Sequence, residues 1–199
     1  MRSDQIQVTF QCFHASSSNF LPDRDIEKLN SFARSFPPAS CVTCTIAADN
    51  YVTSVKLIHE NGKVEELDIH HEGGTRWQDK KSVTFHQYSI DEQGALLIHA
   101  EDSYSDPDHC KSAGLIVHCT SSDPESQWDN FQTNTDDWYS EDRKTLCSDS
   151  DAAFLSYNVD WIRELTANGA KHLWVEGNQV VTLVGSPWND FTLGTGIKA

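Results

Sequence analysis

The first candidate for chemistry is a Cys-x-x-Cys at Cys41 and Cys44, in the stretch "FPPASCVTCTIA". A zinc site or a redox pair needs both sulfurs to converge, and metal knuckles achieve this on a tight turn. Val42, Cys44 and Ile46 instead have the alternation of a strand, in which residues three apart point to opposite faces. The spacing therefore indicates a strand in which the motif is incidental.

A turn that begins at Pro38 leaves one metal hypothesis open. It would free Cys41 to join cysteines from other parts of the chain in a zinc-stabilised module. The sequence has no second Cys-x-x-Cys and no His-x-x-x-His to complete such a site locally. The candidate ligands are therefore Cys41, Cys44, Cys110 and Cys119.

A second hypothesis is a small enzyme with a His/Cys/Asp site on the open face of a sheet. His118 and Cys119 are neighbours on an expected strand, so they point apart and cannot form a nucleophile pair by themselves. The chain has no P-loop, no Gly-x-Ser-x-Gly and no His-Glu-x-x-His. A site would have to be assembled from different strands, and its candidate residues are His86, His99, His118, Cys119 and Asp102.

The strongest compositional signal is charge. Thirty acids face 15 bases, which gives a formal net charge of −15. Such a surface repels nucleic acid and anionic membranes, and it attracts a basic partner through the same field. The alternative interpretation is that the charge serves solubility alone.

Residues 120–150 combine this acidity with aromatic side chains. Acids steer a basic partner and set its orientation, and Trp and Tyr commonly anchor interfaces. The alternative is that the rings fold inward and tether the segment to the sheet. The predicted partner-binding residues are Asp123, Glu125, Trp128, Asp129, Phe131, Asp136, Asp137, Trp138, Tyr139, Glu141 and Asp142.

The remaining pattern predicts an α+β fold in one domain over residues 1–199, with the acidic aromatic segment as an insertion at about 120–150. Consecutive hairpins predict a mainly antiparallel β-sheet. Two α-helices, at about 23–36 and 151–168, are expected to pack on one face of it. The expected strands are 5–12, 42–47, 51–59, 63–69, 83–90, 95–100, 115–119 and two strands joined at Gly177 and Asn178.

The beginning of the chain lacks the apolar run of an export signal, and no stretch approaches the ~20 apolar residues of a spanning helix. We therefore expect a cytoplasmic protein, with its six cysteines as free thiols. No cofactor motif is present, and none is expected.

The function that these patterns favour is a non-catalytic acidic binding protein that caps a basic protein surface. Inhibitors, immunity-type proteins and nucleic-acid mimics are proteins of this kind. The complex should weaken steeply with salt. Replacing Trp128 and Trp138 with alanine should abolish binding and leave the fold intact.

Overall fold

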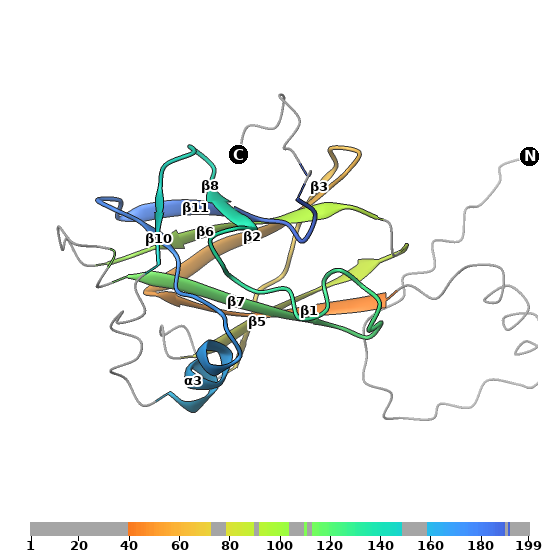
Figure 1. Cartoon of the computed structure of the whole chain (residues 1–199), viewed down its shortest axis with the longest axis horizontal. Coiled ribbons are helices and arrows are strands. Elements are labelled where there is room, and N and C mark those ends of the chain that lie inside the picture. Colours follow the sequence, from red (N-terminus) through yellow and green to blue (C-terminus); the bar gives the residue numbers. More distant parts are fainter. Residues whose placement is uncertain are drawn as a thin grey trace, which may run out of the picture.

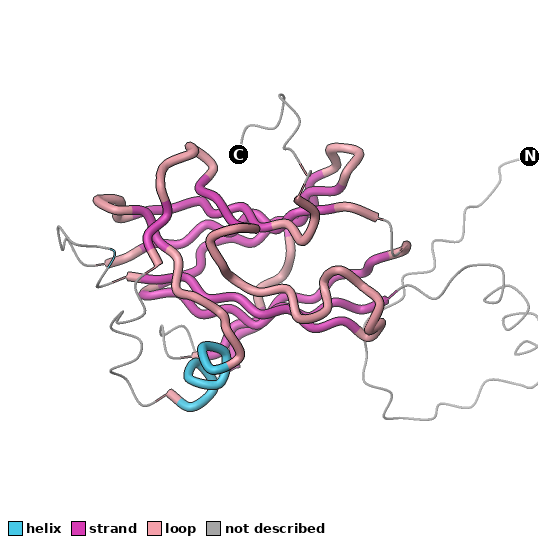
Figure 2. The backbone as a smooth tube through the Cα atoms, viewed as in Figure 1, coloured by secondary structure: helices cyan, strands magenta, loops and turns pink. Residues whose placement is uncertain are grey.

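The computed structural model describes residues 40–72, 79–89, 92–103, 110, 113–148, 159–189 and 191. Strands dominate this part of the chain, which contains one short helix (Figure 2). The elements are β1 (Ser40–Asp49), β2 (Tyr51–His59), β3 (Val64–Glu66), β4 (His70–Glu72), β5 (Lys80–Gln87), β6 (Gly94–Glu101), β7 (Gly114–Ser121), β8 (Trp138–Ser140), β9 (Leu146–Cys147), α3 (Asp160–Ala167), β10 (Trp174–Val175) and β11 (Val180–Gly185).

Two antiparallel sheets form two layers (Figure 1). The first sheet has the strand order β4-β5-β1-β7, and the second has the order β3-β2-β6-β11-β8. A small third sheet pairs β9 with β10. Strands β1, β2, β5, β6, β7 and β11 contribute alternate side chains to one shared core, as expected from the period-2 geometry of a strand.

The core between the sheets is built from small and branched apolar side chains. Val42, Cys44 and Ile46 of β1 face Leu96 and Ile98 of β6, and all five are fully buried. Burying each large aliphatic side chain contributes about 1.5–3 kcal/mol relative to exposure. The parity predicted for Val42, Cys44 and Ile46 is confirmed.

The helix α3 lies on the outer side of the first sheet (Figure 1). Its buried side chains, Ile162 and Leu165, pack against Ala47 of β1 and Ile116 of β7. The helix stops where the sequence predicts, because Gly169 adopts a φ of +100° that a side chain would disfavour.

The α+β prediction with two helices on one face is wrong. The structure is mostly antiparallel β-sheet, and α3 has only eight residues. This helix begins at Asp160, with Val159 as its N-cap, and not at residue 151 as predicted. The expected strand 5–12, the helix 23–36 and residues 151–158 of the second helix lie outside the described residues.

Sheet membership also departs from the prediction of consecutive hairpins. The hairpin of β2 and β3 is confirmed, and its register places Lys56 opposite Glu66. However, β5 pairs with β1 and β4, whereas β6 pairs with β2 and β11. Similarly, β10 pairs with β9 while β11 joins the second sheet. A short connection between strands can pass from one layer to the other, and strand periodicity does not report this.

Gly185 tests the packing between β11 and β8. A Cβ at this position would overlap the indole of Trp138. We expect Gly185→Ala to lower the free energy of unfolding by about 1–3 kcal/mol, the usual cost of overpacking a core. Urea denaturation followed by circular dichroism measures this loss.

Gly62→Ala is the matched control, because nothing lies within 4 Å of a Cβ there and only its φ of +81° opposes the change. It should cost about 1 kcal/mol. A Gly185→Ala protein as stable as the wild type would contradict the packing of Trp138 on β11.

Candidate functional site

Three of the four predicted aromatic anchors are core residues. Trp128, Phe131 and Trp138 are only 1%, 6% and 2% exposed. Trp128 makes edge contacts with Phe85 and Phe131, and Phe131 stacks on Trp138 with ring centroids 5.6 Å apart. The interpretation in which the rings fold inward therefore describes these three. Tyr139 is half-buried, with the Arg143 guanidinium 3.8 Å above its ring.

The acids of the same segment fall into two groups. Several of them organise the local turns: Asp123 accepts a hydrogen bond from the Glu125 amide, Asp129 from the Ser121 amide, and Asp137 from the side chain of Asn134. Asp142 forms an ion pair with Lys144. Glu125 and Asp136 are exposed, and Glu141 is half-buried. The segment thus has exposed acids, but they are not accompanied there by exposed tryptophan.

The residues of the enzyme hypothesis are not brought together. By strand alternation, His86 and His118 belong to the outer face of the first sheet. Their partners on β1 are Cys41 and Thr45, which are four residues, or about 13 Å, apart. His99 lies on the outer face of the second sheet, where it contacts the Thr182 hydroxyl. Cys119 is in the core and Asp102 lies just beyond β6, so the five residues share no pocket.

The cysteines of the zinc hypothesis are disulfide-bonded. Cys44 and Cys119 are directly opposite each other on β1 and β7 and form one disulfide. Cys110 forms another with Cys147, and Cys41 is also disulfide-bonded. A sulfur in a disulfide has no thiolate to offer a metal. The expectation of free thiols is therefore wrong for every described cysteine.

A different cluster, which the sequence analysis missed, lies at the end of the two layers that carries the β2–β3 turn. His59, at the end of β2, is only 9% exposed. Its Nδ1 is 3.3 Å from Glu92 Oε1, and its Nε2 is 3.3 Å from Glu65 Oε2. The imidazole thus joins the β2–β3 hairpin to the turn that precedes β6.

Both carboxylates of this cluster are held by further donors. Glu92 Oε2 accepts a hydrogen bond of 2.9 Å from the Tyr88 amide. Glu65 Oε2 accepts one of 3.2 Å from Lys63 Nζ. Burial alone would raise the pKa of Glu65, but the hydrogen bonds from Lys63 and His59 bring it below its usual value. Glu65 therefore remains charged at neutral pH.

An open concavity of about 300 Å³ lies beside this cluster, lined by His59, Glu60, Asn61 and Glu92. Tyr88, at the edge of the same turn, is 61% exposed. A much smaller cavity of about 10 Å³ continues inward between His59, Glu92, Gln87 and Trp128. The larger hollow is thus acidic and open to solvent, and the core closes directly beneath it.

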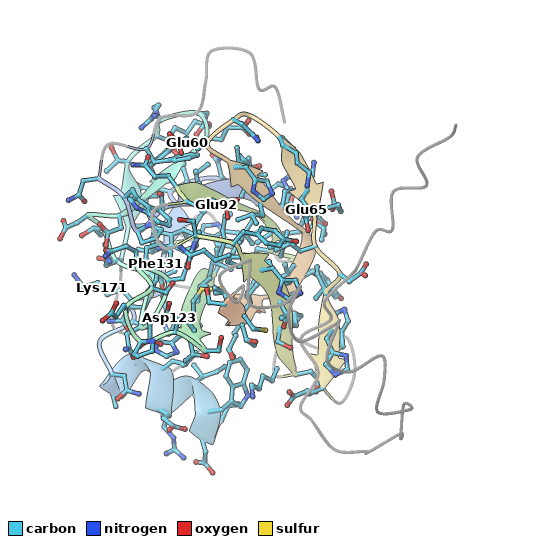
Figure 3. All side chains as sticks on the ribbon, turned by 90° about the vertical axis from the view of Figure 1, so that its right-hand side faces the viewer. Glu60, Glu65, Glu92, Asp123, Phe131 and Lys171 are labelled. Atoms are coloured by element: carbon cyan, nitrogen blue, oxygen red, sulfur yellow. A yellow bond between two sulfur atoms is a disulfide. The ribbon has the colours of Figure 1, made fainter. Side chains whose placement is uncertain are left out.

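The acidic segment lies next to this concavity. Ser126 Oγ donates a 2.6 Å hydrogen bond to Gln87 Oε1, and Trp128 packs near Gly94 at the start of β6. Figure 3 looks at this end of the molecule and shows Glu60, Glu92 and Asp123 one below the other, with Glu65 to one side. We refer to Glu60, Glu65, Glu92, Asp123 and Glu125 as the acidic rim.

Only part of this rim had a signal in the sequence. The strands expected at 51–59 and 63–69 predicted the hairpin that positions Glu60 and Glu65, and Asp123 and Glu125 were predicted as binding residues. Glu92 and His59 follow no motif, because their proximity depends on two strands that lie side by side in the second sheet.

Family models, curated proteins and solved structures offer no match to this chain. Within the described residues, no helix is both long and apolar enough to cross a membrane. The functional argument therefore depends on the geometry of this molecule alone.

Two buried titratable groups lie away from the acidic rim. Burial, together with the negative charge of Asp102, raises the pKa of Asp49 to about 6. Burial lowers the pKa of His172 to about 4. Asp49 ends β1, and its Oδ1 accepts a hydrogen bond from the Asn50 side chain. Each residue therefore favours its neutral form in the fold.

These two groups should have opposite effects on stability. Asp49 costs stability above pH 6, and the cost disappears as the pH falls toward its unfolded value of 3.8. His172 costs nothing above its unfolded value of 6.5, and its cost grows as the pH falls toward 4. Each contribution is about 3 kcal/mol, so in the wild type they largely cancel between pH 6.5 and 4.

Asp49→Asn should reveal how the stability of the fold depends on pH through His172 alone. Asparagine keeps the oxygen that accepts from Asn50, and it has no charge to bury. We expect the variant to be about 3 kcal/mol more stable than the wild type at pH 8 and equally stable at pH 4. Urea unfolding at a series of pH values measures both curves. Parallel curves would contradict the burial of a charged Asp49.

From the sequence, Trp128→Ala was expected to leave the fold intact. The structure predicts that it destabilises the fold. Because the indole lies between Phe85, Phe131 and Trp188, its removal should cost about 3–5 kcal/mol and expose the core to water. Thermal denaturation tests this, with Gln127→Ala as the control at the exposed neighbouring position. An unchanged melting temperature for Trp128→Ala would restore the view of this ring as a surface anchor.

Proposed function

We propose that this protein is a non-catalytic acidic binding protein that caps a basic surface of another protein through its acidic rim. The observation that carries the proposal is the open concavity bordered by Glu60 and Glu92, with Glu65 held beside it by its contact with His59. An inhibitor, an immunity-type protein or a nucleic-acid mimic would use such a surface.

Charge supports this proposal over other classes of partner. The chain carries 30 acids and 15 bases, and the rim gathers five acids from three separate segments. Such a field raises the rate of encounter with cations and orients them. By the same argument, direct binding to nucleic acid or to an anionic membrane stays disfavoured.

An exposed aromatic ring supports the proposal as well. Tyr88 is 61% exposed beside Glu92, and Val64, on the neighbouring strand β3, is 44% exposed. Interfaces are typically anchored by a few aromatic or apolar groups within a polar border. This end of the molecule therefore has both acids and an exposed aromatic residue. The sequence analysis expected tryptophans of residues 120–150 in that role, whereas the exposed residue is Tyr88.

The cytoplasmic location predicted from the sequence stays a prediction, and the disulfides weigh against it. Cys44–Cys119 and Cys110–Cys147 would persist in an oxidising compartment, whereas cytoplasmic thiols are normally kept reduced.

Capture of partners from an extract of the source cells, on the immobilised full-length protein, tests the proposal. The bound proteins should be basic, and they should elute between about 0.1 and 0.3 M salt because exposed charges are screened over that range. Glu60→Gln combined with Glu125→Gln should weaken binding about three- to tenfold, as expected for the loss of two exposed charges.

Glu164→Gln combined with Glu176→Gln is the matched control. It removes the same charge from two exposed positions, one on α3 and one in the β10–β11 turn. It should bind like the wild type. Equal weakening by both double variants, or binding that salt does not affect, would show that the rim is not the binding surface.

A further inference from the structure

We propose that the concavity beside His59 receives one arginine side chain of the partner. This inference rests on the function proposed above and names the group that the acidic rim recognises. It is carried by the open hollow and by the two carboxylates that line it.

Glu92 is held in place before any ligand arrives. One of its oxygens lies 3.3 Å from His59 Nδ1, and the other accepts a hydrogen bond of 2.9 Å from the Tyr88 amide. Each carboxylate oxygen has two lone pairs, so both oxygens can accept one more donor. The side chain is 29% exposed and is therefore accessible from the concavity.

Glu60 supplies a second carboxylate on the β2–β3 turn. Its backbone is fixed by a hydrogen bond from its amide to the Gln93 carbonyl, 3.1 Å away, which ties the two turns together. The side chain is exposed, and among the described residues no cation lies within ion-pair distance of it. The concavity thus has a negative charge on each of the two turns that form it.

The guanidinium group fits these features better than an ammonium group. It is planar, presents five N–H donors in a fork, and can bond two carboxylates at once. A lysine ammonium is a strongly hydrated point charge that lacks this planar fork of donors.

The depth of the hollow limits the ligand to the end of a side chain. The concavity of about 300 Å³ is open to solvent, and the cavity beneath it holds only about 10 Å³, roughly one water molecule. His59 and Trp128 close the base. A chain segment or a large ring would therefore remain outside, whereas a guanidinium on a flexible stem can enter.

The test is a titration of the ¹⁵N-labelled full-length protein with N-acetyl-arginine amide, followed by NMR. The amide signals of Glu60, Asn61 and Glu92 should shift together, with a dissociation constant of about 1–10 mM, as expected for a single side chain. N-acetyl-lysine amide should bind at least threefold more weakly, and the uncharged citrulline analogue should give no saturable shift.

Glu60→Gln should weaken arginine binding by threefold or more, while its spectrum shows an intact fold. Glu176→Gln, at an exposed position on another turn, should bind like the wild type. Equal affinity for arginine and lysine, or shifts that do not include these amides, would overturn the subsite. Salt-sensitive capture of basic proteins that depends on Glu60 and Glu125 would then leave the broader function standing, so the two failures are distinguishable.

Discussion

The acidic end of this molecule depends on the burial of one ring, that of Trp128. The indole makes edge contacts with Phe85 of the first sheet and with Phe131 and Trp188 of the loops. It also packs against Gly94, where the second sheet begins. The two sheets and the acidic segment therefore meet at a single side chain, and the positions of Asp123 and Glu125 follow from it.

Polar contacts then fix the surface above this ring. Ser126 bonds to Gln87, and the Trp128 amide donates to the Ser126 hydroxyl. His59 connects the two neighbouring turns through Glu65 and Glu92. Hydrogen bonds in which one partner is a charged carboxylate hold both partners in defined positions. Carboxylates that are already oriented lose less conformational entropy when a cation binds, which suits a recognition surface.

The local structure could be predicted from the sequence better than its assembly. Period-2 alternation located the strands around Val42–Ile46 and Tyr51–His59, and the hairpin expected between 51–59 and 63–69 is present. The pairing of β5 with β1 could not be predicted, because strand patterns report which face is buried and not which strand lies alongside. The disulfide between Cys44 and Cys119 was missed for the same reason, since the two residues lie 75 positions apart.

The candidate site shows the same division. The acids at positions 123 and 125 were visible as composition, and the choice between inward and outward tryptophan rings was left open, because a ring in a polar segment satisfies either pattern. His59 and Glu92 became a site only through the pairing of β2 with β6. Residues that meet across a sheet without a shared motif carry no signal in a single sequence.

The most direct measurement is hydrogen exchange of the protein with and without its captured basic partner, resolved to short peptides. The account predicts added protection in residues 59–65, 88–93 and 121–126, and unchanged exchange in α3 and in the β10–β11 turn. Protection confined to α3 or to the outer faces of the two sheets, with these three segments unchanged, would contradict it.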